Sequence, residues 1–159
     1  MVSGNCLKIK YVCDFLEIPY TWIGVDVVAG EARTTAMMLK NPVGQVPFVE
    51  FDDGRVLAQS NAIMRFLATG SALIPEDSFD CALMDQWMFW EQYSHETAIA
   101  VARFQVKLAG KAVTDLEPAL VKKGYAALDV MEKHLHGNKW FVGNKLSLAD
   151  IALVAYTQF

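Results

Sequence analysis

The residues that could do chemistry gather between Gly44 and Phe66, where the sequence reads GQVPFVEFDDGRVLAQSNAIMRF. Pro47 stands directly before a predicted strand, and a proline there can hold a cis peptide bond, which usually marks a tight turn. Such a turn would leave the backbone N–H and C=O of Val46 open to pair with an extended peptide, as an added strand does. The stretch therefore predicts a site that recognises a ligand through the main chain.

The same stretch predicts an anion-binding group at Ser60. This residue is a suitable N-cap, and the first N–H groups of a helix together with its dipole attract a carboxylate. The side-chain amide of Gln59 could donate to the same carboxylate. Spacing alone leaves two interpretations open. One is a ligand site that combines a clamp at Val46 and Pro47 with a carboxylate pocket at Gln59 and Ser60, and the other is a structural turn followed by an ordinary cap.

Short elements of both kinds are predicted to position these residues. Apolar spacing indicates a helix over 5–16, a β-branched and aromatic run indicates a strand over 18–28, and a short helix over 30–39 must end at Asn41 because Pro42 follows. The segments PFVEF and RVLA read as strands joined at an Asp-Gly turn, and a helix from Ser60 follows, ending by Gly70.

The second half of the chain is predicted to be helical throughout. One long helix runs from about residue 83 to 104, and another covers 116–135. In LSLADIALVAY, Ser147 and Asp150 have the spacing of a capping box, while Leu146 and Ile151 have that of a hydrophobic staple. A third helix is therefore expected to begin at Ser147.

The composition limits the class of protein. The chain has 159 residues, of which 53% are hydrophobic and 20% charged, enough for one domain or two small ones. A net charge of -4 without a basic cluster argues against nucleic acid or an anionic membrane as partner. Three cysteines without a C-x-x-C pair fit a reducing cytoplasm. No uncharged apolar run approaches the roughly 20 residues needed to span a bilayer.

Three segments resemble the glutathione S-transferase family, in particular its bacterial, theta-like and beta-like members. They are NPVGQVPFVEFDDGRVLAQSNAIMRFLA, FVGNKLSLADIALVAY and SGNCLKIKYVCDFLEIPYTWIGVDV. The resemblance implies an α/β thioredoxin-like domain over 1–70, a linker over 71–79 and an all-α domain over 80–159. It also implies a homodimer, glutathione as co-substrate and no metal.

The resemblance assigns a role to each residue of the opening stretch. The backbone of Val46 would pair with the cysteinyl part of glutathione, with Pro47 cis. Gln59 and Ser60 would hold the γ-glutamyl group, and Gln45 lies where members often contact the glycyl end.

Ser3 is the first candidate for activating the thiol, since it aligns with the activating serine of theta-like members. Its hydroxyl would donate a hydrogen bond to the glutathione thiolate, and the helix N-terminus would add positive potential. Two alternatives remain open: Asn5, where some bacterial classes use an amide, and Cys6, which could form a mixed disulfide. A buried hydrophobic role is the ordinary one for a helical cysteine such as Cys6.

The function implied by the resemblance is conjugation of glutathione to small hydrophobic electrophiles. Tyr93 and Phe104 on the long helix are candidate electrophile contacts. The segment SHETA begins like a metalloprotease helix, but Ile99 stands where a second ligand is needed, so we expect no metal and place His95 on the helix surface or at an interface. The alternatives are a thiol transferase or peroxidase acting through Cys6, and a non-catalytic interaction module.

The sequence departs from the family pattern at both ends. Only Met1 and Val2 precede Ser3, where members have a strand, and members run further beyond the capping-box helix. We therefore expect a chain truncated at both ends, lacking the first strand of its sheet and binding glutathione less tightly than an extended version.

Overall fold

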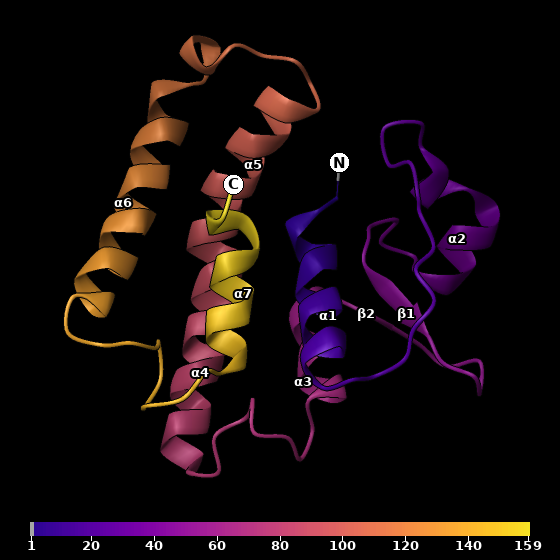
Figure 1. Cartoon of the computed structure of the whole chain (residues 1–159). Helices are drawn as coiled ribbons and strands as arrows, with labels where there is room; N and C mark the ends of the chain where they lie inside the picture. The colour runs from indigo at the N-terminus through magenta and orange to yellow at the C-terminus, as the bar shows by residue number, and fades with distance from the viewer. Residues whose placement is uncertain (1) are drawn as a thin grey trace. The chain divides into compact units, whose positions relative to one another are not determined.

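The computed structural model describes residues 2–159, which form two compact units, 2–71 and 72–159 (Figure 1). The first unit combines helices with a small sheet, and the second is all helical, as predicted. Within the described residues no helix is long and apolar enough to cross a bilayer. The elements of the first unit are α1 (Gly4–Phe15), a 3-10 turn (Glu31–Arg33), α2 (Thr35–Lys40), β1 (Phe48–Glu50), β2 (Val56–Ala58) and α3 (Ser60–Leu67).

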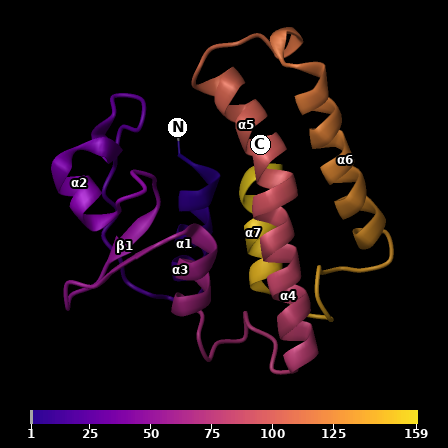
Figure 2. The same ribbon diagram turned by 180° about the vertical axis from the view of Figure 1, so that it is seen from behind.

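The core of the first unit lies where α1 packs on α3, and the two helices run side by side in Figures 1 and 2. From α1, Val12 and Cys13 are buried, and from α3, Ile63 and Met64 are buried. Each fully buried side chain of this size contributes roughly 1.5 to 3 kcal/mol. This packing holds the first turns of both helices in place, and those turns carry the candidate site.

The two short strands form the predicted hairpin. β1 and β2 are antiparallel, with Phe48 opposite Ala58 and Glu50 opposite Val56. The turn is closed by a hydrogen bond of 2.8 Å from the Gly54 N–H to the Phe51 carbonyl. Gly54 has φ 81°, a left-handed conformation that glycine adopts without steric cost. The Asp-Gly signal therefore located the turn correctly.

The strand predicted over 18–28 does not form. In the described chain, residues 19–25 make no backbone hydrogen bond to another strand, and Trp22 and Ile23 are exposed. The prediction was wrong because β-branched and aromatic residues favour a strand only when a neighbouring strand supplies the hydrogen bonds and packing. The sheet of the described residues consists of β1 and β2 alone.

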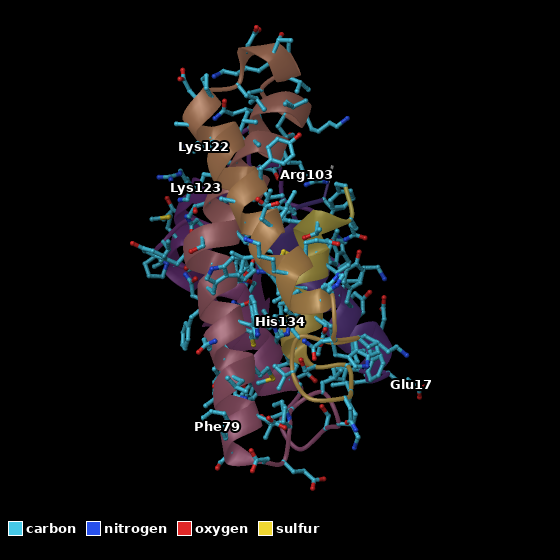
Figure 3. All side chains as sticks on the ribbon, turned by 90° about the vertical axis from the view of Figure 1, so that its left-hand side faces the viewer. Glu17, Phe79, Arg103, Lys122, Lys123 and His134 are labelled. Atoms are coloured by element: carbon cyan, nitrogen blue, oxygen red, sulfur yellow. The ribbon has the colours of Figure 1, made fainter. Side chains whose placement is uncertain are left out.

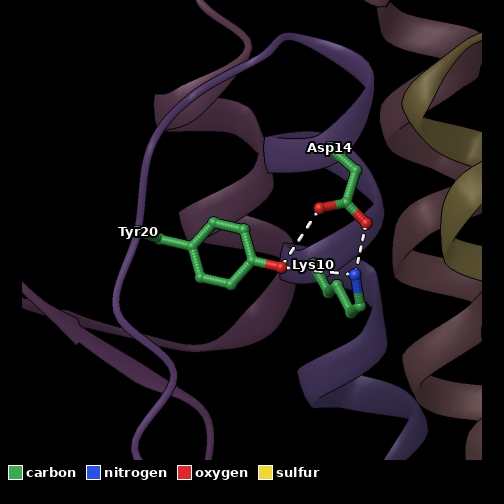
Figure 4. Close-up of polar contacts among 3 residues, drawn as sticks. All are labelled: Lys10, Asp14 and Tyr20. Atoms are coloured by element: carbon green, nitrogen blue, oxygen red, sulfur yellow. Dashed lines mark hydrogen bonds and ion pairs between the residues drawn. The ribbon is translucent and has the colours of Figure 1, made fainter.

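A polar contact on the surface attaches this extended segment to α1 (Figure 4). The Tyr20 hydroxyl donates to one oxygen of Asp14 at 3.1 Å, and the Lys10 ammonium donates to the other. The pKa of Asp14 is lowered, first by the hydrogen bond from Lys10. The three groups are exposed, so the contact orients the segment and adds little stability.

The second unit consists of α4 (Ser78–Trp90), a π-helical turn (Glu91–His95), α5 (Glu96–Lys107), a 3-10 turn (Val113–Asp115), α6 (Pro118–Leu135) and α7 (Leu148–Thr157). The first three run without a break, which confirms the long predicted helix, although no sequence signal indicated the π turn. α7, yellow in Figure 1, packs against α4 and α5. Most of its residues are buried, so it forms the core of this unit.

His95 lies in the core and not on the surface, so that prediction was wrong. Its side chain is fully buried, and Nε2 lies 3.0 Å from the Thr157 hydroxyl at the end of α7. A π turn adds residues to one turn of the helix and so redirects the side chains within it. Glu91 and His95 are the two buried residues of this turn. The His95 ring therefore connects the long helix to α7.

An aromatic cluster of Trp87, His134 and Phe141 connects α4 with α6 and with the chain before α7. The His134 ring, labelled in Figure 3, stacks on Phe141 with centroids 5.4 Å apart, and its Nε2 lies 3.0 Å from the Phe141 carbonyl. Trp87 meets both rings edge-on at 4.8 Å. Edge-to-face and offset pairs of this kind add about 0.5 to 1.5 kcal/mol beyond burial. The cluster fixes the chain that leads into α7.

Candidate functional site

The site begins at the N-terminus of α3. Ser60 is the first residue of this helix and Gln59 is its N-cap, so the prediction that Ser60 is the cap was off by one residue. Gln59 has φ 71° and ψ 111°, a conformation that costs a side-chain-bearing residue of order 1 kcal/mol or more. Within residues 2–159 the N–H of Ser60 has no backbone acceptor, since the first hydrogen bond of the helix runs from Ile63 to Gln59. This helix end therefore keeps its anion-binding capacity.

The Ser60 hydroxyl is used in a tertiary contact rather than in capping. It donates to the side-chain oxygen of Asn5 at 3.2 Å, across 55 residues of sequence. Ser60 is 5% exposed, so the contact is shielded from water. The structure thereby brings one predicted activating residue, Asn5, to the predicted carboxylate pocket.

Ser3 is the N-cap of α1, and its carbonyl accepts from the N–H groups of Cys6 and Leu7, each at 3.0 Å. Its side chain makes no capping hydrogen bond to the helix backbone. The hydroxyl instead forms a hydrogen bond with the side chain of Cys6. Burial raises the pKa of the Cys6 thiol to about 11, and the contact with Ser3 acts in the opposite direction. Cys6 is therefore a neutral thiol near neutral pH.

The loop before β1 is held by Asn41, which sequence reasoning named only as the end of a short helix. Asn41 is 4% exposed, and its side-chain N–H donates to the Gln45 carbonyl at 2.7 Å. Its side-chain oxygen accepts from the Val43 N–H at 3.3 Å. An Asn-Pro pair favours the start of a turn, so it was an available signal. Asn41 fixes the direction in which Gln45 and Val46 leave the loop.

Gly44 lies in the same loop, and both its conformation and its surroundings exclude a side chain. It has φ 65°, and an added Cβ would lie 3.0 Å from the Met38 sulfur. The peptide bond between Val46 and Pro47 is cis, as the resemblance implies. The N–H and C=O of Val46 make no hydrogen bond to the backbone within residues 2–159, while Gln45 is exposed. The main chain at Val46 is therefore available to a ligand.

Lys8 is a further polar residue that sequence reasoning missed. Its side chain is completely buried between α1 and α3, and Nζ lies 3.5 Å from the side-chain oxygen of Asn61, the neighbour of Ser60. Lysine is almost never fully buried without polar partners. No sequence signal distinguishes Lys8 from the exposed Lys10 two residues later. Its cation lies one turn of α1 beyond the contact between Asn5 and Ser60.

The two candidate electrophile contacts both belong to the long helix of the second unit. Tyr93 lies in the π turn and is 84% exposed, and Phe104 lies on α5 and is 48% exposed. Neither ring is needed for the core of that unit. Among the residues the structure describes, no group of three or more histidine, cysteine or acidic side chains could hold a metal ion.

Comparison with known proteins identifies the family. The model of the glutathione S-transferase N-terminal domain matches residues 2–69, and that of the C-terminal domain matches residues 83–159. Together they cover most of the chain. This protein belongs to the glutathione S-transferase family, and its α/β unit followed by a helical unit is the fold of that family.

Individual relatives agree with this assignment. The crystal structure of a glutathione S-transferase from Pseudomonas fluorescens is 47% identical, has a TM-score of 0.94 and matches over 98% of this chain and 79% of its own. The glutathione S-transferase-like protein LUC7 of a Fusarium species is 35% identical over 131 residues, which are 75% of this chain and 56% of LUC7. Elongation factor 1-gamma 3 of Oryza sativa is 29% identical over 159 residues, covering 95% of this chain and 37% of that protein. The chain thus spans little more than half of the curated relative LUC7.

Proposed function

We propose that this protein conjugates glutathione to small hydrophobic electrophiles, with Ser3 activating the thiol. The observation that carries the proposal is the hydrogen bond from Ser60 to Asn5, because it joins the carboxylate pocket to the first turn of α1, where Ser3 is the N-cap. One end of a bound tripeptide would then be anchored at α3 while its thiol approaches Ser3.

The individual contacts follow from the groups that the fold leaves available. The γ-glutamyl carboxylate would bind at the N–H of Ser60 and the amide of Gln59, where the helix dipole favours negative charge. The cysteinyl backbone would pair with the N–H and C=O of Val46 beside Pro47. The exposed Gln45 would contact the glycyl end. Family membership supports glutathione as the co-substrate.

The Ser3 hydroxyl would donate a hydrogen bond to the thiolate. Hydrogen bonds to charged groups contribute roughly 1.5 to 3 kcal/mol, and each 1.36 kcal/mol lowers a pKa by one unit. One such bond therefore lowers the pKa of bound glutathione by about one to two units. Tyr93 and Phe104 are proposed to contact the electrophile. We further propose a cytoplasmic location, consistent with three cysteines that form no disulfide, and a homodimer as in many family members.

Calorimetric titration with glutathione tests the binding site, and the rate of conjugation of chlorodinitrobenzene tests the chemistry. Ser60→Ala should weaken glutathione binding by up to about tenfold, because it removes the shielded hydrogen bond to Asn5 that holds the carboxylate pocket against the first turn of α1. Ser3→Ala should leave binding nearly unchanged and lower kcat roughly 10- to 100-fold near neutral pH. Ser78→Ala, at the exposed start of α4, is the matched control. Full activity of Ser3→Ala would refute its role.

The same measurements distinguish two other functions from conjugation. Thiol transfer through Cys6 is disfavoured by burial, which keeps this thiol protonated. It would be supported if Cys6→Ser abolished turnover. A non-catalytic interaction module is suggested by the similarity to an elongation factor 1-gamma. That function would be supported if neither the wild type nor its variants bound glutathione.

A further inference from the structure

The hydrogen bond between Ser60 and Asn5 determines what the Ser60 hydroxyl can offer a ligand. The hydroxyl donates to the side-chain oxygen of Asn5 at 3.2 Å. A serine hydroxyl has a single hydrogen and two lone pairs, so this donation leaves its oxygen as an acceptor only. The side chain of Ser60 can therefore accept a hydrogen bond from a ligand N–H group, but it cannot donate one to a carboxylate.

The direction of this hydrogen bond agrees with the electrostatics of α3. The N-terminus of a helix carries partial positive charge, which attracts an oxygen and repels an amide N–H group. Asn5 contacts α3 at its first residue, so the side-chain oxygen is the end of the amide that the helix favours there. Because Ser60 is 5% exposed, water does not readily replace Asn5 as the acceptor. The hydroxyl hydrogen is thus committed to Asn5.

The backbone N–H of Ser60 has the opposite character, because it is a donor at the positive end of the helix. One residue therefore presents a donor for an anion and an acceptor for a cation. The backbone nitrogen and the hydroxyl oxygen of a serine are separated by the same number of covalent bonds as the ammonium nitrogen and a carboxylate oxygen of an α-amino acid. The pair of groups on Ser60 thus matches a ligand that carries both charges on one carbon atom.

We propose that Ser60 recognises the α-amino acid end of glutathione with both of its polar groups: its N–H binds the γ-glutamyl carboxylate, and its hydroxyl oxygen accepts from the adjacent ammonium. Asn5 is the positioning residue, since it holds the hydroxyl hydrogen away from the ligand. This inference rests on the proposed binding of the γ-glutamyl group at α3. It gives the pocket selectivity for an unmodified α-amino group, which a carboxylate site alone does not have.

The size of the selectivity follows from two opposing effects. A hydrogen bond to a charged group strengthens binding roughly 10- to 100-fold, whereas the positive end of α3 weakens the binding of an ammonium by a few fold. Loss of the ammonium should therefore weaken binding about tenfold. Asn5→Ala releases the hydroxyl hydrogen, which can then donate to the carboxylate, so the preference for the ammonium should decrease.

The test compares glutathione with two analogues by calorimetric titration. Glutaryl-cysteinylglycine lacks only the α-ammonium, and 4-aminobutanoyl-cysteinylglycine lacks only the α-carboxylate. We expect the wild type to bind the first analogue about tenfold more weakly than glutathione. In Ser60→Ala this factor should fall to about twofold or less, because the acceptor is lost. The factor for the second analogue should stay unchanged in Ser60→Ala, because the backbone N–H remains.

Variants of Asn5 test its positioning role. Asn5→Ala should lower the factor for the first analogue and raise the factor for the second. Asn5→Asp keeps an acceptor oxygen and should retain the preference for the ammonium. Asn144→Ala, at an exposed position of the second unit, is the matched control and should leave both factors unchanged. Each factor compares ligands on the same variant, so partial unfolding weakens all affinities equally and leaves the factor intact.

Several outcomes would overturn the inference. One is equal binding of glutathione and the first analogue by the wild type, and another is a factor for the first analogue that persists in Ser60→Ala. A factor for the second analogue that falls in Ser60→Ala would show that the hydroxyl donates to the carboxylate instead. Unchanged factors in Asn5→Ala would refute its positioning role. If the wild type does not bind glutathione at all, the proposed function itself is refuted, and this inference with it.

Discussion

Asp150 is predicted to be one of the most stabilising polar residues of the helical unit. Its carboxylate accepts three hydrogen bonds that hold the start of α7: from the N–H of Ser147 at 2.8 Å, from the Ser147 hydroxyl at 2.9 Å and from the N–H of Phe141 at 3.0 Å. Ser147 is 2% exposed and Phe141 is 7% exposed. Water therefore cannot readily replace the carboxylate at these donors.

Asp150→Ala leaves all three donors without their acceptor. An unsatisfied buried donor costs roughly 1 to 3 kcal/mol, and Asp150 itself is half-buried, so partial rehydration places the expected loss at about 3 to 5 kcal/mol. A domain has only about 5 to 15 kcal/mol of stability in total. This one substitution should therefore bring the helical unit close to unfolding.

Urea unfolding followed by tryptophan fluorescence is a suitable assay, since three of the four tryptophans lie in residues 72–159. Asp129→Ala, at an exposed position of α6, is the matched control and should change the free energy of unfolding by no more than about 0.5 kcal/mol. Asp150→Asn keeps one oxygen, which serves either Phe141 or Ser147, and should be intermediate. A loss below about 1 kcal/mol for Asp150→Ala, or a loss equal to that of the control, would refute the reasoning.

Two more predictions concern the first unit. The Cys6 thiol ionises at its ordinary pKa of 9.0 in the unfolded chain and at about 11 when folded, so the unfolded state loses its proton first as pH rises. The wild type should therefore lose about 2 kcal/mol of stability between pH 9 and 11 that Cys6→Ala does not lose, as measured by urea unfolding; parallel pH profiles would contradict this. Gln59 has φ 71°, where glycine fits and alanine does not. Gln59→Gly should be about 1 kcal/mol more stable than Gln59→Ala in thermal unfolding. Both variants lose the side-chain amide and should bind glutathione more weakly. The reverse order of stability would count against backbone strain at this position.

Local signals predicted those elements whose geometry depends on a few neighbouring residues. The Asp-Gly turn gave the hairpin, and the spacing of Ser147 and Asp150 gave the first residue of α7. Both rest on hydrogen bonds between residues at most a few positions apart. The run of apolar residues at helical spacing likewise indicated the long helix that begins with α4.

The errors occurred where a distant residue decides the outcome. The strand predicted over 18–28 lacked a hydrogen-bonded neighbour. The Ser60 hydroxyl donates a hydrogen bond to Asn5, 55 residues away, instead of capping α3. His95 was expected on the helix surface or at an interface, but the π turn and α7 enclose it in the core. Periodicity cannot indicate such cases because each depends on which groups meet after the chain has folded.

The sequence by itself determined the family, the two types of unit and the segment that carries the candidate site. The resemblance ranked Ser3 ahead of Asn5 and Cys6, but the sequence could not show which groups each of the three contacts. The tertiary structure supplies their partners: Asn5 contacts Ser60, and the half-buried Cys6 contacts Ser3. The physical reason is that a side chain's proton affinity and hydrogen-bonding direction depend on burial and on its neighbours in space, and packing of α1 against α3 supplies both.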